Sequence, residues 1–154
     1  MTIYALSTAH GVSGLAVIRV SGHLALTALK TLTRKSHFEA SVMTRSDFHE
    51  PESGRLIDKG LCVYFAKPKS FTGEDVVEIH VHGSQIVINK ILQSLGTIQN
   101  IRMAEPGEFS KQAFLNNKMD LTAIEAMGDL INAQTEAQLE NALSQMGGKL
   151  SELY

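Results

Sequence analysis

The sequence predicts an α+β fold, in which a mixed sheet with helices is followed by the start of an α-helical domain. Strand-like and helix-like segments alternate from residue 3 to residue 114, as in domains that pack helices on a sheet. From Asp120 onward the apolar pattern is only helical. A composition of 44% hydrophobic and 19% charged residues allows a packed core. We therefore predict a first domain over residues 1–119 and the start of a helical domain over residues 120–154.

The first third of the chain predicts two strands, a helix and a loop. Residues 3–6 and 15–20 are apolar runs separated by glycines, and the second is rich in β-branched residues. Ser21 is a candidate helix N-cap, because an apolar stripe at helical spacing follows it. Residues 34–54 are polar and poorly periodic, which predicts a loop with weak structure.

The next segments predict a hairpin and a loop. Residues 55–58 and 61–65 read as two paired strands that turn at Lys59-Gly60, since glycine favours tight turns. Residues 67–73, with a proline and a glycine, read as a loop.

Two more strands and two helices follow. Residues 76–81 read as a strand, and Gly83-Ser84 opens a helix with apolar residues at helical spacing. Residues 98–103 read as a strand, and Pro106-Gly107 precedes a short helix. Asp120 can then cap the first of the C-terminal helical stripes. No stop signal follows Leu150, so we expect this helix to continue and its apolar stripe to need a partner.

Charge and cysteine content limit the possible classes of function. The net charge of −2 gives no reason to expect a broad basic surface for nucleic acid, although a local basic patch stays possible. Cys62, the single cysteine, lies in an apolar run and is interpreted as a small buried residue, not a nucleophile. No stretch approaches ~18 apolar residues, and no leader pattern is present. We expect a cytoplasmic protein.

The strand over residues 76–82 places Glu78, His80 and His82 on one face, because strand side chains alternate. Val77, Ile79 and Val81 lie on the other face. Three interpretations stay open. The face is exposed to solvent, or it holds a metal ion, although a further ligand at short spacing is missing. Alternatively, the carboxylate of Glu78 accepts two parallel hydrogen bonds from a ring with adjacent N–H donors. The pterin ring of folate presents such an edge.

Two basic residues are also candidates for ligand contacts. Arg19 interrupts an apolar strand, so it lies at an edge, pairs with a carboxylate such as Glu78, or holds a ligand anion. Lys118 stands just before the predicted helical domain, where an exposed surface lysine is the usual interpretation. The N–H groups after Gly83 would favour an anion, unless the glycine only turns the chain.

No phosphate-binding loop of the G-x-x-x-x-G-K-[ST] type occurs, and neither a dinucleotide fingerprint nor a G-x-S-x-G string is found. The sequence therefore gives no support to a self-contained hydrolase or nucleotide-binding enzyme, and we expect that this chain is not a complete enzyme.

Several specific strings follow one another in a fixed order. They are Ile18-Arg19-Val20-Ser21-Gly22, Ser70-Phe71-Thr72-Gly73-Glu74-Asp75, His82-Gly83, Pro106-Gly107-Glu108-Phe109, Ala113-Phe114-Leu115-Asn116 and Lys118-Met119-Asp120-Leu121. In this order and spacing they resemble the N-terminal region of the MnmE family (also called TrmE) of tRNA modification GTPases. The similarity spans nearly the whole chain and is weakest over residues 34–54.

The resemblance implies a fold similar to the tetrahydrofolate-binding domain of the glycine-cleavage aminomethyltransferase, and a homodimer. The implied cofactor is 5-formyl- or 5,10-methylene-tetrahydrofolate, contacted by Arg19, Glu78 and Lys118. Glu78 would suit the pterin edge, and the two basic residues would suit carboxylate or carbonyl oxygens.

In the full-length family members, the resemblance implies a GTPase domain that uses GTP, Mg²⁺ and K⁺. With the FAD-dependent partner MnmG, such a protein would modify C5 of the wobble uridine in tRNA. Departures from the family pattern are the loop at residues 9–14, Ser84 in place of a glycine, and Glu105 in place of an arginine. The alternative is a dimerisation scaffold without a working folate pocket.

Overall fold

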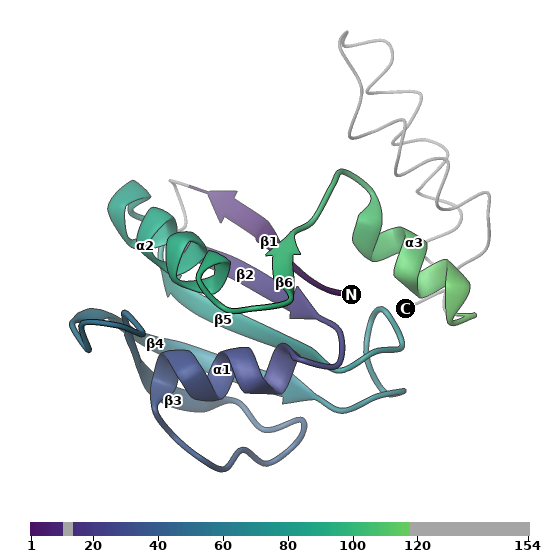
Figure 1. Ribbon diagram of the computed structural model, residues 1–154, viewed down its shortest axis with the longest axis horizontal. Helices are drawn as coiled ribbons and strands as arrows, with labels where there is room; N and C mark the ends of the chain where they lie inside the picture. Colours follow the sequence, from purple (N-terminus) through teal and green to yellow (C-terminus); the bar gives the residue numbers. More distant parts are fainter. Residues whose placement is uncertain (11–13, 118–154) are drawn as a thin grey trace, which may run out of the picture. The chain divides into compact units, whose positions relative to one another are not determined.

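The structure is a computed structural model that describes residues 1–10 and 14–117 of the 154-residue chain. These residues form a six-stranded sheet and three helices (Figure 1). The chain divides into two compact units, residues 1–70 with 74–104 and residues 71–73 with 105–154. The sheet and the first two helices belong to the first unit, and α3 (Glu108–Leu115) belongs to the second.

The sheet is mixed, with the strand order β3-β4-β5-β2-β1-β6. All neighbouring strands are antiparallel except β1 and β6, which are parallel. The predicted mixed sheet with helices is therefore confirmed. The strands are β1 (Thr2–His10), β2 (Leu15–Ser21), β3 (Thr44–His49), β4 (Leu56–Phe65), β5 (Val76–His82) and β6 (Ile101–Met103).

Helices α1 (Ala25–Thr33) and α2 (Gln85–Gly96) cover the same face of the sheet (Figure 1). Leu29 of α1 and Ile91 of α2 are fully buried in one core cluster with Val77 and Ile79 of β5. Burial of each such side chain stabilises the fold by roughly 1.5–3 kcal/mol. This packing leaves the other face of the sheet, turned away from α1 and α2, for polar side chains. We refer to it as the polar face.

The start of α1 differs from the prediction, because Ser21 belongs to β2 and does not cap the helix. The N-cap residue is Leu24, and no side chain caps the helix. The backbone N–H of Leu24 donates to Oγ1 of Thr2 at 3.0 Å and thereby holds the start of α1 against β1. Gly22, between the end of β2 and Leu24, has φ +137°, and a Cβ on this residue would stand 2.6 Å from Cα of Thr2. The turn therefore requires glycine and delays the helix.

The region from residue 34 to residue 65 also differs from the prediction. Residues 34–54 are not only a loop, because they include β3, whose Phe48 is fully buried. The predicted hairpin at Lys59-Gly60 is wrong, since β4 runs through both residues without a turn. Gly60 is instead a point of close approach, where a Cβ would lie 2.1 Å from the carbonyl oxygen of His80.

The remaining predictions within the described residues hold with small shifts of boundary. The strands near residues 3–6, 15–20 and 76–81, the loop over 67–73 and the helices after Ser84 and Gly107 are confirmed. The last strand is shorter than predicted and covers only Ile101–Met103. The helical pattern from Asp120 and the boundary between residues 119 and 120 lie outside the described residues.

Candidate functional site

The alternation predicted for β5 is confirmed. Its residues Val77, Ile79 and Val81 are buried in the core beneath the helices. On the polar face, the side chains of Glu78 and His80 are about four-fifths buried, with 21% and 22% exposed. These two residues therefore do not belong to a fully solvated strand surface, which makes them candidates for specific contacts.

Arg19 and Glu78 are direct cross-strand partners on β2 and β5. Nη2 of Arg19 donates to Oε2 of Glu78 at 3.2 Å, and Nε2 of His80 lies 3.3 Å from Oε1. Both carboxylate oxygens are thus engaged by side chains of the protein. An ion pair this shielded from water interacts more strongly than an exposed one.

The position of Arg19 tests two of its three predicted roles. Strand β2 lies inside the sheet between β5 and β1, so the prediction of an edge position is wrong. The prediction of a carboxylate partner is confirmed by the contact with Glu78. A contact with a ligand anion stays a prediction.

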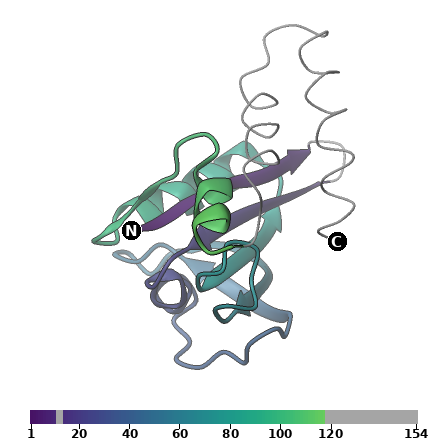
Figure 2. The same cartoon turned by 90° about the vertical axis from the view of Figure 1, so that its right-hand side faces the viewer.

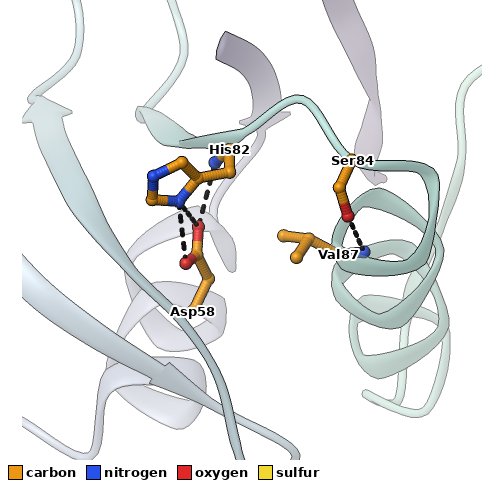
Figure 3. Close-up of polar contacts among 4 residues, drawn as sticks. All are labelled: Asp58, His82, Ser84 and Val87. Atoms are coloured by element: carbon orange, nitrogen blue, oxygen red, sulfur yellow. Dashed lines mark hydrogen bonds and ion pairs between the residues drawn. The ribbon is translucent and has the colours of Figure 1, made fainter. Parts of the chain in front are cut away.

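At the end of β5, His82 contacts Asp58 of β4 (Figure 3). Its backbone N–H donates to Oδ2 of Asp58 at 2.9 Å, and its Nδ1 lies 2.9 Å from both carboxylate oxygens. Burial alone would raise the pKa of Asp58, but hydrogen bonds from His82 and from the backbone of Lys59, with the charge of His82, outweigh it and hold this pKa below its usual value. This contact ties the ends of β4 and β5 together.

The junction after His82 is explained by local structure. The hydroxyl of Ser84 accepts a hydrogen bond from the backbone N–H of Val87 at 3.3 Å and caps α2 (Figure 3). Gly83 donates to the carbonyl of Gly14 at 2.8 Å, and a Cβ on it would stand 3.3 Å from that backbone. Gly83 thus lies where two chain segments approach closely and an added Cβ would require a small shift, and Ser84 acts as a helix cap.

The polar face gives no support to a metal site. Within residues 1–10 and 14–117, no group of three or more histidine, cysteine, aspartate or glutamate side chains has the arrangement of metal ligands. Cys62 is fully buried, as predicted, with its Sγ 3.3 Å from Oγ of Ser46. Burial raises the pKa of its thiol, which makes the thiolate scarce and the residue a poor nucleophile.

Lys118, the third predicted contact, lies outside the described residues. The structure therefore brings together two of the three predicted site residues, Arg19 and Glu78. Two cavities of the first unit, of about 600 Å³ and 280 Å³, are lined by other residues.

In the second unit, two of the recognised strings contact each other. Nδ2 of Asn116, from Ala113-Phe114-Leu115-Asn116, donates to the carbonyl of Thr72 at 3.0 Å. The side chain of Glu108 accepts a hydrogen bond from the backbone N–H of Glu105 at 2.9 Å, just before α3. These contacts explain why the strings contain an asparagine and a glutamate at these positions.

Sequence reasoning missed a cluster of basic residues. Lys35, Arg45 and Lys59 line the cavity of about 600 Å³. They lie far apart in the sequence, and only the pairing of β3 with β4 brings the last two together. The net charge allows a local basic patch, but the sequence of residues 34–54 does not show the strand pairing that locates it.

Comparison with known proteins decides the family. A family model described as "GTP-binding protein TrmE N-terminus" matches residues 2–118. The chain belongs to this family. The resemblance inferred from the strings is thereby confirmed for the TrmE N-terminal region.

Relatives of this TrmE N-terminal chain carry the name tRNA modification GTPase MnmE. The chain is 52% identical over 153 residues to the protein of Rickettsia bellii (strain OSU 85-389), 53% to that of Anaplasma phagocytophilum (strain HZ) and 49% to that of Parvibaculum lavamentivorans. Each match covers 99% of this chain and 34–35% of the relative. The chain thus spans about a third of the length of these relatives. In the described part of the chain, no helix has both the length and the apolarity to cross a membrane.

Proposed function

We propose that this TrmE N-terminal chain binds a reduced folate, 5-formyl- or 5,10-methylene-tetrahydrofolate, and forms a homodimer. The observation that carries the proposal is the shielded carboxylate of Glu78 beside the guanidinium of Arg19 on the polar face. In the proposal, the fold is that of the tetrahydrofolate-binding domain of the glycine-cleavage aminomethyltransferase. Lys118 is the third contact to the folate.

The chemistry of Glu78 and Arg19 fits a folate. A carboxylate accepts two parallel hydrogen bonds from adjacent N–H donors, such as those on the edge of a pterin ring. Arg19 and His80 hold the two carboxylate oxygens from either side, which fixes the orientation of the carboxylate before a ligand arrives. Because both oxygens already have partners, the pterin edge must exchange with or share these contacts.

The larger protein is part of the same proposal. A GTPase domain beyond this chain would use GTP, Mg²⁺ and K⁺, and the FAD-dependent protein MnmG would be the partner in modifying C5 of the wobble uridine of tRNA. The folate held by this chain would supply the one-carbon unit. The chain alone would hydrolyse no GTP.

A second candidate is a dimerisation scaffold with an idle folate pocket. The specific observation in its favour is that Arg19 and His80 already satisfy both oxygens of Glu78. Ser84, which departs from the family pattern, is engaged in capping α2. This candidate predicts a dimer that does not respond to folate.

Calorimetric titration of the chain with 5-formyltetrahydrofolate, run beside light scattering, separates the two candidates. We expect saturable binding to a dimer, and Glu78→Ala should weaken binding by more than about 1 kcal/mol, because it leaves ring donors unpaired. Glu39→Ala, which removes an exposed glutamate between α1 and β3, is the matched control and should bind like the parent. A dimer without heat at ligand concentrations well above micromolar would support the scaffold, and a monomer would contradict both candidates.

A further inference from the structure

The cavity of about 600 Å³ lies between the end of α1 and the strands β3 and β4. Lys35, Arg45 and Lys59 line it, together with one carboxylate, Asp47. Its volume falls within the roughly 300–1,000 Å³ of typical small-molecule sites. The lining therefore has a net charge of two positive units in a chain whose formal net charge is −2.

Lys35 is fixed against the edge strand. Its Nζ donates to the backbone carbonyl of Arg45 at 2.8 Å and to Oγ of Ser46 at 3.0 Å. Neither acceptor carries a charge, so these contacts hold the ammonium group without neutralising it. The position of one cation is thus set by the fold.

The other two cations come from neighbouring strands. Arg45 of β3 lies opposite Leu61, and Asp47 lies opposite Lys59 of β4. Cross-strand neighbours two residues apart lie within reach of long side chains. Arg45 and Lys59 therefore reach the same cavity from adjacent strands.

Within the described part of the chain, the cations of this cavity form no ion pair with a carboxylate. Among residues 1–10 and 14–117, ion pairs join Arg19, His80, His82 and Lys90 to carboxylates, but none involves Lys35, Arg45 or Lys59. His49 also lines the cavity, and its Nδ1 is buried without a hydrogen-bond partner in the described structure. An oxygen-rich anion would balance the positive charge of the lining.

We propose that this cavity binds a phosphate group. Two net positive charges match a phosphate dianion, and an arginine fork with lysine ammonium groups is a common phosphate-binding set. The phosphate belongs either to a small phosphorylated molecule or to an RNA backbone. This inference does not rest on the folate proposal.

Titration of the ¹⁵N-labelled chain with inorganic phosphate and with pyrophosphate tests the site. We expect saturable shifts of the amide signals of Ser46, Lys59 and Gly60, with pyrophosphate binding more tightly than phosphate. Arg45→Gln and Lys59→Gln should each weaken binding by about tenfold, because each removes one charge-assisted contact. Lys69→Gln, which changes an exposed lysine outside the cavity, should leave the affinity unchanged.

A competition with unmodified tRNA identifies the source of the phosphate. Displacement of pyrophosphate by tRNA, with tRNA affinity lowered in the same two variants and by added salt, would assign the site to an RNA backbone. Binding of pyrophosphate without such displacement would assign it to a small phosphorylated molecule. The proposal is overturned when both anions leave these amides unmoved, or when Arg45→Gln and Lys59→Gln bind like the parent.

Discussion

The centre and the edge of the sheet differ in how their positively charged side chains are paired. At the centre, on β2 and β5, Arg19 faces a carboxylate 3.2 Å away on the neighbouring strand. At the edge, on β3 and β4, Arg45 and Lys59 line a cavity without a carboxylate ion pair among the described residues. The central charge is thus neutralised by the protein itself, and a ligand there must exchange with an internal contact. At the edge, Asp47 is the one carboxylate among the described residues that line the cavity, so two positive charges of the lining are not balanced there.

Strand β3 should be packed firmly against the core through Phe48. The substitution Phe48→Ala tests this packing and has the largest expected effect on the unfolding free energy. Phe48 is the largest fully buried side chain of the described residues, so its truncation should cost about 3–5 kcal/mol of unfolding free energy. Urea denaturation measures the change. Leu56→Ala, at a side chain that is 46% exposed, is the control and should cost less than about 1 kcal/mol. If Phe48→Ala and Leu56→Ala lower the unfolding free energy by equally small amounts, residues 44–49 behave as the loop that the sequence predicts.

The central pair should matter for stability as well as for binding. Glu78→Ala removes the partner of two side chains and leaves a largely shielded guanidinium without its carboxylate, so we expect a loss of about 2 kcal/mol. Glu78→Gln keeps an oxygen that accepts from Arg19 and should lose about half as much. Urea denaturation of both variants beside Glu39→Ala provides the measurement. If all three unfold alike, the pair contributes nothing to the fold.

The contact between Asp58 and His82 should make the stability of the sheet depend on pH. Because the pKa of Asp58 is lowered in the folded state, its contribution is present above the unfolded pKa of about 4 and is lost as the pH falls below it. Asp58→Asn should therefore lose about 1 kcal/mol at neutral pH and show a flatter decline in acid. Unfolding curves from neutral pH to about pH 3 for both proteins would run parallel if this contact were unimportant.

The smallest effect on stability is expected at the edge. Arg45→Gln and Lys59→Gln change exposed side chains that form no ion pair with any described residue, so the unfolding free energy should stay within about 0.5 kcal/mol of the parent. Thermal and urea unfolding measure this directly. A loss as large as that of Glu78→Ala would mean that these cations stabilise the fold and are not held ready for an anion.

The sequence predicted the centre of the sheet well, because the signals there are local. Alternation along residues 76–82 separated the buried from the polar side chains, and a single arginine in an apolar strand indicated a carboxylate partner. The helix after Ser84 followed from a cap and an apolar stripe at helical spacing. In each case the residues that determine the structure are neighbours in the chain.

The edge could not be predicted for the converse reason. Strand β3 buries only Ser46 and Phe48, which is too few apolar residues for a recognisable pattern. Gly60 resembles a turn residue, although the backbone of His80 on β5 is what requires it. The hydrogen bond that holds Leu24 at the start of α1 comes from Thr2, 22 residues earlier in the chain. Contacts between distant segments set all three features, and no local pattern reports them.

The most direct test of the proposed folate site is a titration of the ¹⁵N-labelled chain with 5-formyltetrahydrofolate, followed through its amide signals. The account predicts saturable shifts at Arg19, Glu78 and their neighbours on β2 and β5, lost in Glu78→Ala and kept in Glu39→Ala. Shifts confined to Arg45, Lys59 and Gly60 would place the ligand in the edge cavity, and a spectrum without shifts would exclude binding. Either result would contradict a folate site built on Glu78.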